Sequence, residues 1–153
     1  MCARDERIKR MLVEAEKSLF NNDLLADKDW VNYVIHDGFR EVTDTGRLIF
    51  KDEVLQKMGH CHTKLELVPN NVEYVQVSEN SWLLYYIIDT GEAKEYHTSL
   101  WIKSDIPFAD LSDIDIDESD NNEYQYFKDL NTMKVVFHQI SIVQTPVNLI
   151  PFE

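Results

Sequence analysis

The stretch Glu95-Tyr96-His97-Thr98-Ser99-Leu100-Trp101-Ile102-Lys103 decides the fold. Its alternating side chains and its aromatic and β-branched residues favour a strand. A second stretch of the same kind, Met133 to Val143, follows after residues 104–132. We expect these two strands to pair as the middle of a curved antiparallel sheet.

The chain before this pair is predicted to supply three helices and further strands. A helix is expected over residues 5–20, because apolar residues recur there at helical spacing: Ile8, Met11, Leu12, Ala15 and Leu19. Asp27 or Asp29 is a candidate cap for a short helix through Val34, and a third helix is expected over 51–58. A turn is expected at 36–38, and the strands at 39–43, 48–50, 63–68, 72–77, 81–89, 93–103 and 133–143. Helices followed by an antiparallel meander indicate an α+β fold.

Length and charge limit the class of protein. A chain of 153 residues and 18.0 kDa predicts a single domain over residues 1–153. The net charge of −13 argues against nucleic acid and anionic membranes as partners, because both require a basic surface. The charged N-terminus, the two cysteines and the lack of a long apolar run predict a cytoplasmic protein.

The predicted strand Trp82-Leu83-Leu84-Tyr85-Tyr86-Ile87-Ile88 is apolar on both faces. A sheet with one wet face alternates apolar and polar residues, so we expect both faces of this strand to be covered. One face would meet the helices or a cavity, and the other would meet a second subunit. The alternative is that long loops cover the second face.

Residues 104–132 are predicted to be a loop insertion rich in acidic residues between 105 and 123. One hypothesis for this segment is a calcium-binding loop of the EF-hand type. Counted from Asp113, however, the sixth position is Glu118 where such a loop has glycine, and the twelfth is Tyr124 where it has glutamate. A solvated, self-repelling loop is therefore the simpler prediction.

Four short strings resemble the nuclear transport factor 2-like superfamily. They are Asp37-Gly38-Phe39-Arg40-Glu41 with Gly46, Lys51-Asp52-Glu53-Val54-Leu55, Thr98-Ser99-Leu100-Trp101 and Val136-Phe137-His138-Gln139. This superfamily includes ketosteroid isomerase, scytalone dehydratase, SnoaL-like cyclases and the association domain of calcium/calmodulin-dependent kinase II. The likeness covers about residues 5–145 and is greatest to small bacterial SnoaL-like members of unknown function.

The resemblance implies a cystatin-like roll, in which a cone-shaped sheet wraps over the N-terminal helix. It also implies a pocket at the open end and a homodimer formed through the outer face of the sheet. Carried over from the kinase association domain, the pattern places Ser99 and Gln139 inside the pocket, where both are neutral rather than basic. The long insertion after Lys103 departs from the tight turn usual in the family.

Glu41 is the leading candidate for a general base, because burial in an apolar cone would raise its proton affinity. His97 is the second candidate base. Tyr33, Tyr85 or Tyr96 are candidate oxyanion donors of the kind that ketosteroid isomerase uses. The alternative for Glu41 is an ion pair with an arginine such as Arg47, or plain exposure. The expected pocket lining is Trp30, Tyr33, Phe39, Tyr85, Ser99, Trp101, Phe137 and Gln139.

Alternation of faces assigns His138 to the side opposite Phe137 and Gln139, with a packing or interface role. His60-Cys61-His62 suggests a metal site, but no further ligands at a paired spacing accompany it, so we expect neither a metal nor a cofactor.

Two functional hypotheses follow. One is a small-molecule-binding or dimeric association protein with an apolar pocket that takes a hydrophobic ligand. The other is a cofactor-free isomerase, dehydratase or cyclase that acts on a hydrophobic carbonyl compound. The sequence does not decide whether the protein is an enzyme.

Overall fold

The computed structural model describes residues 3–20, 26–57, 71–89, 91–109 and 131–143. Three helices and six strands lie in these ranges, in the order α1 (Ala3–Ser18), α3 (Lys28–Val34), β1 (Ile35–Val42), β2 (Leu48–Phe50), α4 (Lys51–Lys57), β3 (Val72–Ser78), β4 (Ser81–Asp89), β5 (Lys94–Lys103) and β6 (Met133–Ile142). Among the described residues, no helix has both the length and the apolar character needed to cross a membrane. The expected strand at 63–68 lies outside these ranges, and the cytoplasmic location stays a prediction.

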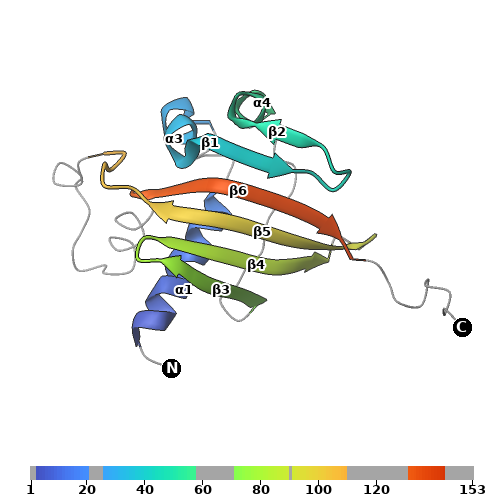
Figure 1. The fold of residues 1–153 in the computed structure, drawn as a ribbon, viewed down its shortest axis with the longest axis horizontal. Helices are drawn as coiled ribbons and strands as arrows, with labels where there is room; N and C mark the ends of the chain where they lie inside the picture. The colour runs from blue at the N-terminus through green and yellow to red at the C-terminus, as the bar shows by residue number, and fades with distance from the viewer. Residues whose placement is uncertain (1–2, 21–25, 58–70, 90, 110–130, 144–153) are drawn as a thin grey trace, which may run out of the picture.

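All six strands form one curved, unclosed sheet in the order β2-β1-β6-β5-β4-β3 (Figure 1). The pairing of β5 with β6 is antiparallel and runs from Glu95–Ile142 to Lys103–Met133, as the sequence predicts. The α+β class is confirmed. One feature differs from a simple meander: β1 pairs with β6 in parallel, so the first and last of the described strands lie side by side.

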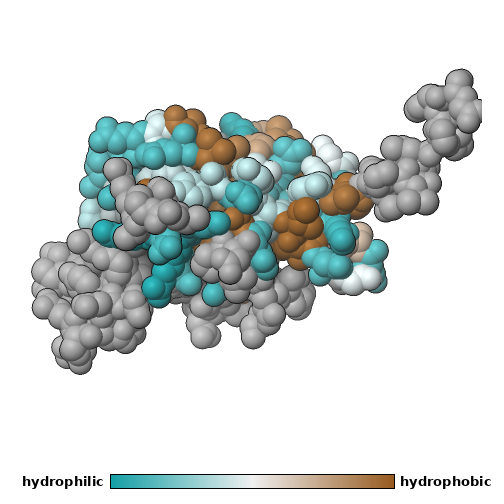
Figure 2. Space-filling model, turned by 90° about the horizontal axis from the view of Figure 1, so that it is seen from below, coloured by the Kyte–Doolittle hydropathy of each residue, from teal (hydrophilic) through white to brown (hydrophobic). Residues whose placement is uncertain are grey.

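The two faces of the sheet differ in their exposure. On β4 and β5 every second residue is buried, which marks the inner face. Between these residues, apolar side chains of the outer face remain at the surface. From the side of β3 and the N-terminus of α1, Figure 2 shows hydrophobic side chains at the surface among hydrophilic ones.

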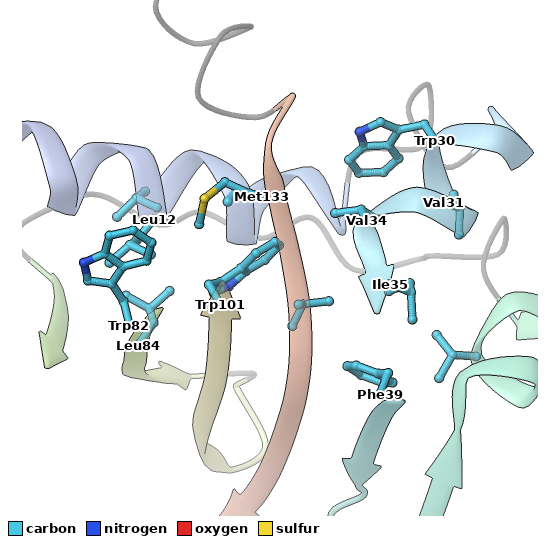
Figure 3. Packing of buried hydrophobic residues seen from close by; sticks show 14 of the residues in the cluster. Leu12, Trp30, Val31, Val34, Ile35, Phe39, Trp82, Leu84, Trp101 and Met133 are labelled. Atoms are coloured by element: carbon cyan, nitrogen blue, oxygen red, sulfur yellow. The ribbon is translucent and has the colours of Figure 1, made fainter. Parts of the chain in front are cut away.

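Helix α1 packs against the inner face. Its apolar residues form the predicted stripe, with Leu12 and Ala15 buried and Ile8, Met11 and Leu19 packed against the core. Figure 3 shows Leu12 of α1 close to Trp82, Trp101 and Met133, and a second group around Ile35 and Phe39 on the far side of β6. Burying each such large apolar side chain contributes about 1.5–3 kcal/mol to folding.

Strand β6 contains a register shift that changes which residues face inward. Trp101 pairs with Val135, but Leu100 pairs with Phe137, so Val136 is an extra residue on β6. Directly paired residues point to the same face, and Ser99 therefore shares its face with His138. The expectation that Phe137 and Gln139 point inward, with His138 on the opposite face, is wrong, because this bulge reverses the alternation.

Strand β1 runs through the turn expected at residues 36–38. The irregularity appears instead as a shift in its pairing with β6 between Ile35 and Arg40. The next connection is the predicted turn, in which Gly46 adopts φ +83° and links β1 to β2. Such a positive φ favours glycine because it has no Cβ.

The two ends of the predicted insertion are joined to each other. The amide of Ser104 donates to the carbonyl of Thr132 (2.7 Å) and that of Phe108 to Asn131 (2.9 Å). The buried side chain of Asn131 accepts from the amide of Ala109 (2.8 Å) and donates to its carbonyl (2.7 Å). The β5–β6 hairpin therefore continues beyond the sheet before the chain enters residues 110–130, which lie outside the described ranges.

Asn131→Ala should lower the free energy of unfolding by about 1–2 kcal/mol, since it removes the two hydrogen bonds that the Asn131 side chain makes to Ala109. Urea denaturation followed by tryptophan fluorescence measures the change. The matched control is Asn80→Ala at an exposed position, with an expected change within about 0.5 kcal/mol. Equal midpoints for the two variants would contradict the bracing role of Asn131.

Candidate functional site

A buried carboxylate lies between α1 and the inner face of the sheet. Glu16 is fully buried and falls four residues after Leu12, on the face of α1 that meets the sheet. Its Oε1 accepts from the indole Nε1 of Trp101 (2.8 Å), and its Oε2 accepts from Oγ of Ser99 (3.0 Å) and from the hydroxyl of Tyr86. Three hydrogen-bond donors from β4 and β5 thus converge on one carboxylate.

This arrangement stabilises the Glu16 carboxylate and keeps Tyr86 neutral. An isolated buried carboxylate would be very costly, but charge-assisted hydrogen bonds offset the loss of hydration. Burial raises the pKa of the Tyr86 hydroxyl far above its ordinary value, and the neighbouring Glu16 charge adds to the shift. Tyr86 is therefore a hydrogen-bond donor in this cluster and not an acid.

Two histidines lie next to this carboxylate. Nδ1 of His97 is 3.1 Å from Nε2 of His138, and the His97 ring stacks on Tyr86 with centroids 5.3 Å apart. The other nitrogen of each ring meets a carboxylate: Nε2 of His97 is 3.1 Å from Oε1 of Glu95, and Nδ1 of His138 is 2.7 Å from Oε1 of Glu41. We call Glu95, His97, His138 and Glu41 the carboxylate–histidine chain.

The two imidazoles differ in their affinity for a proton. Burial lowers the pKa of His97, although Glu95 opposes this shift. Burial also works against the charged form of His138, but its hydrogen bond to Glu41 and the charge of Glu16 together hold its pKa above the ordinary value. Of the two rings, His138 therefore binds a proton more tightly than His97.

The structure brings together several of the predicted site residues. Glu41 and His97, the two candidate bases, belong to one hydrogen-bonded chain through His138. Ser99 and Trp101 hold the Glu16 carboxylate. Trp30 and Phe39, which are also in the predicted lining, are buried in the apolar core.

Other predicted residues lie elsewhere. Tyr85 is 40% exposed on the outer face, and Phe137 and Gln139 lie on that face as well, because the bulge turns His138 inward in their place. Tyr33 donates to the carbonyl of Ile106 and packs on Phe108 at the base of the insertion. We correct the pocket assignment of these four side chains accordingly.

The candidate oxyanion donors and the expected ion pair are also corrected. Tyr96 is 47% exposed on the outer face, and the tyrosine that enters the cluster is Tyr86. Arg47 pairs with Glu53, whereas Glu41 pairs with His138.

Glu16 was not predicted to be a site residue, and His138 was predicted to have a packing or interface role on the face opposite the pocket. Glu16 stands between Leu12 and Leu19 in the apolar stripe, so a charged residue at a core position was the available signal. His138 carries no such signal, because its inward orientation depends on the bulge at Val136. Within the described ranges no group of three or more His, Cys, Asp or Glu is placed to hold a metal ion, and His60, Cys61 and His62 lie outside those ranges.

Glu16→Gln should destabilise the protein by roughly 2–4 kcal/mol, because the amide oxygen accepts fewer of the converging hydrogen bonds and the NH₂ group faces a donor. A shift of the urea midpoint at constant m-value measures this loss. Glu14→Gln, on the partly exposed face of the same helix, is the matched control with a change within about 0.5 kcal/mol. Equal midpoints for both variants would mean that Glu16 does not anchor α1.

No protein-family model and no curated protein matches the sequence. Among solved structures, an NTF2-like protein from Cytophaga hutchinsonii is similar at 13% identity and a TM-score of 0.54, over 94% of this chain and all of that one. An NTF2-like protein of unknown function from Prochlorococcus has 10% identity and a TM-score of 0.49, over 95% and 96% of the two chains. A proposed calcium/calmodulin-dependent kinase II association domain from Exiguobacterium sibiricum has 12% identity and a TM-score of 0.47, over 95% and 97%. This chain has the NTF2-like fold that the resemblance predicts.

Proposed function

We propose that this protein is a homodimeric association module that pairs through the outer face of its sheet. The observation that carries the proposal is a row of side chains on that face that crosses all six strands. The paired residues that define the outer row, from β3 to β2, are Val75, Leu83, Leu100, Phe137, Arg40 and Phe50.

The outer row and its neighbours remain open to solvent. Its end residues Val75 and Phe50 are 50% and 47% exposed, and Ile87 and Tyr96, paired across β4 and β5, are both 47% exposed. The described part of the chain therefore leaves this face uncovered. Contiguous exposed apolar surface of this kind marks an interaction site.

A second copy of the chain is the occupant that best fits the charge of this face. The protein has 28 acidic residues and a net charge of −13, so most of its surface repels another copy. In the outer row the sole charged residue is Arg40, whose guanidinium lies 4.3 Å from the ring centroid of Phe50. A two-fold pairing of this face buries apolar rows against each other, and no member of the row is acidic.

Ile87→Asp should weaken the dimer at least about 30-fold, since it places a charge on the proposed interface at a cost of about 2 kcal/mol. Native mass spectrometry and light scattering over a dilution series give the oligomeric state. The wild type should have twice the 18.0 kDa chain mass. Ile106→Asp is the matched control, because Ile106 is 75% exposed and lies outside the sheet.

A wild-type protein that is monomeric at all concentrations would contradict the proposal. So would an Ile87→Asp variant that forms dimers as tightly as the Ile106→Asp variant does. The same spectra, recorded under gentle conditions, test for a small hydrophobic molecule retained from the cell, which is the ligand-binding part of the hypothesis.

The second candidate function is cofactor-free proton transfer on a hydrophobic carbonyl compound. One observation favours it: Glu41 and His97, chosen as bases from the sequence alone, belong to a single hydrogen-bonded chain with His138. The side chain of Glu41 is 20% exposed at the end of that chain. A base there would pass its proton along an existing path of hydrogen bonds.

Exchange of the α-hydrogens of 2-tetralone in D₂O, followed by mass spectrometry, tests this activity. The wild type should accelerate exchange over buffer, and Glu41→Gln should reduce the acceleration at least 100-fold. Glu73→Gln, at an exposed position on the outer face, should leave the rate unchanged. If His97→Gln abolishes exchange while Glu41→Gln does not, His97 is the base; no acceleration by the wild type would reject proton transfer on this ketone.

A further inference from the structure

The carboxylate–histidine chain contains three hydrogen bonds in series on three adjacent strands. They join Glu95 and His97 of β5 to His138 of β6 and Glu41 of β1. The imidazoles are buried, at 4% and 7% exposure, and the carboxylates at the two ends are partly exposed. Each ring uses both of its nitrogens in this chain.

Three hydrogen bonds require three protons. Two neutral histidines carry only two, and the carboxylates draw these to Nε2 of His97 and Nδ1 of His138. Nδ1 of His97 and Nε2 of His138 would then face each other at 3.1 Å with a lone pair on each and no hydrogen between them. The observed geometry therefore belongs to a state with one additional proton.

We propose that the carboxylate–histidine chain is a buried proton-binding site, which holds one proton between His97 and His138 and loses it as the pH rises. Binding adds H⁺ from solvent to the Nε2 lone pair of His138, which then donates to Nδ1 of His97, and no other bond changes. The chain passes from a net charge of −2 to −1. Imidazole holds a proton about two pH units more tightly than a carboxylate, so the proton stays on the rings.

The surrounding charges support this placement of the proton. Three carboxylates face the pair: Glu16 from α1, Glu41 from β1 and Glu95 from β5. Tyr86 of β4 stacks on His97 as a neutral ring. These negative charges offset the burial of the cation and hold the pKa of His138 above its ordinary value.

The consequence is a stability that depends on pH. Because the folded state binds this proton more tightly than the unfolded chain, its contribution is complete below the unfolded histidine pKa of about 6.5. It is lost as the pH rises through the higher folded pKa of His138. Above that pH the two lone pairs repel, so the contacts between β1, β6 and β5 weaken. This inference concerns the inner face and does not depend on dimer formation.

Long-range ¹H–¹⁵N NMR of the histidine rings in the full chain counts the protons directly. At the low end of a pH series from 6 to 9, three of the four ring nitrogens of His97 and His138 should be protonated, and the count should fall to two in one step as the pH rises. Ring resonances are assigned with His97→Gln, His138→Gln and His36→Gln, since His36 lies outside the chain. A count of two or of four throughout the series would overturn the proposal.

Two glutamate variants separate the proton site from general packing. Glu41→Gln keeps a hydrogen-bond acceptor but removes the charge that faces His138, so the step should move at least one pH unit lower. Glu95→Gln, which faces the neutral His97, should move it less. Circular dichroism confirms that each variant is folded, and a step at the same pH in both variants and the wild type would contradict the role assigned to Glu41.

Discussion

The buried carboxylate of Glu16 is the constraint on which the rest of the structure depends. A charge this deeply buried is tolerated only when its oxygens are hydrogen-bonded, and Tyr86, Ser99 and Trp101 supply all three donors. The donors sit on two neighbouring strands, so α1 is fixed in both rotation and depth against the sheet. Leu12 then meets Trp82, Trp101 and Met133 as a consequence of that position.

A single extra residue on β6 determines the composition of the inner face. Without the bulge at Val136, Phe137 and Gln139 would point toward α1, and His138 would point outward. With it, an aromatic side chain joins the outer row and an imidazole comes within hydrogen-bond distance of Glu41 and His97. Bulges re-aim side chains in this way next to functional sites.

The sequence predicts the elements well and the site only in part. Helix α1 and the β5–β6 pair follow from periodicity, because each buries one regular face. The parallel pairing of β1 with β6 has no local signal, since it joins residues about a hundred positions apart. The positions of Glu16 and His138 were not predicted for a related reason. The role of a charged residue in an apolar stripe, and the effect of a bulge, can be seen only when their partners on other elements are known. Glu41 and His97 lie on the inner face as alternation along their strands predicts, and their role as bases stays a prediction.

The two faces of the sheet are suited to different kinds of recognition. On the inner face, the polar atoms of Glu16, His97 and His138 already have hydrogen-bond partners within the fold, so a polar ligand there must replace hydrogen bonds that already exist. Among the members of the carboxylate–histidine chain, only Glu41 and Glu95, at its two ends, are partly exposed. Both are carboxylates, which favours a proton or a hydrogen-bond donor over an acidic ligand at these ends. In the outer row Arg40 alone has a polar side chain, which donates to the carbonyls of Gly38 and Phe39, so burial of the other five side chains needs no exchange of polar contacts. Association through the outer face and proton binding on the inner face are therefore compatible in one sheet, because they use opposite sides of the same strands.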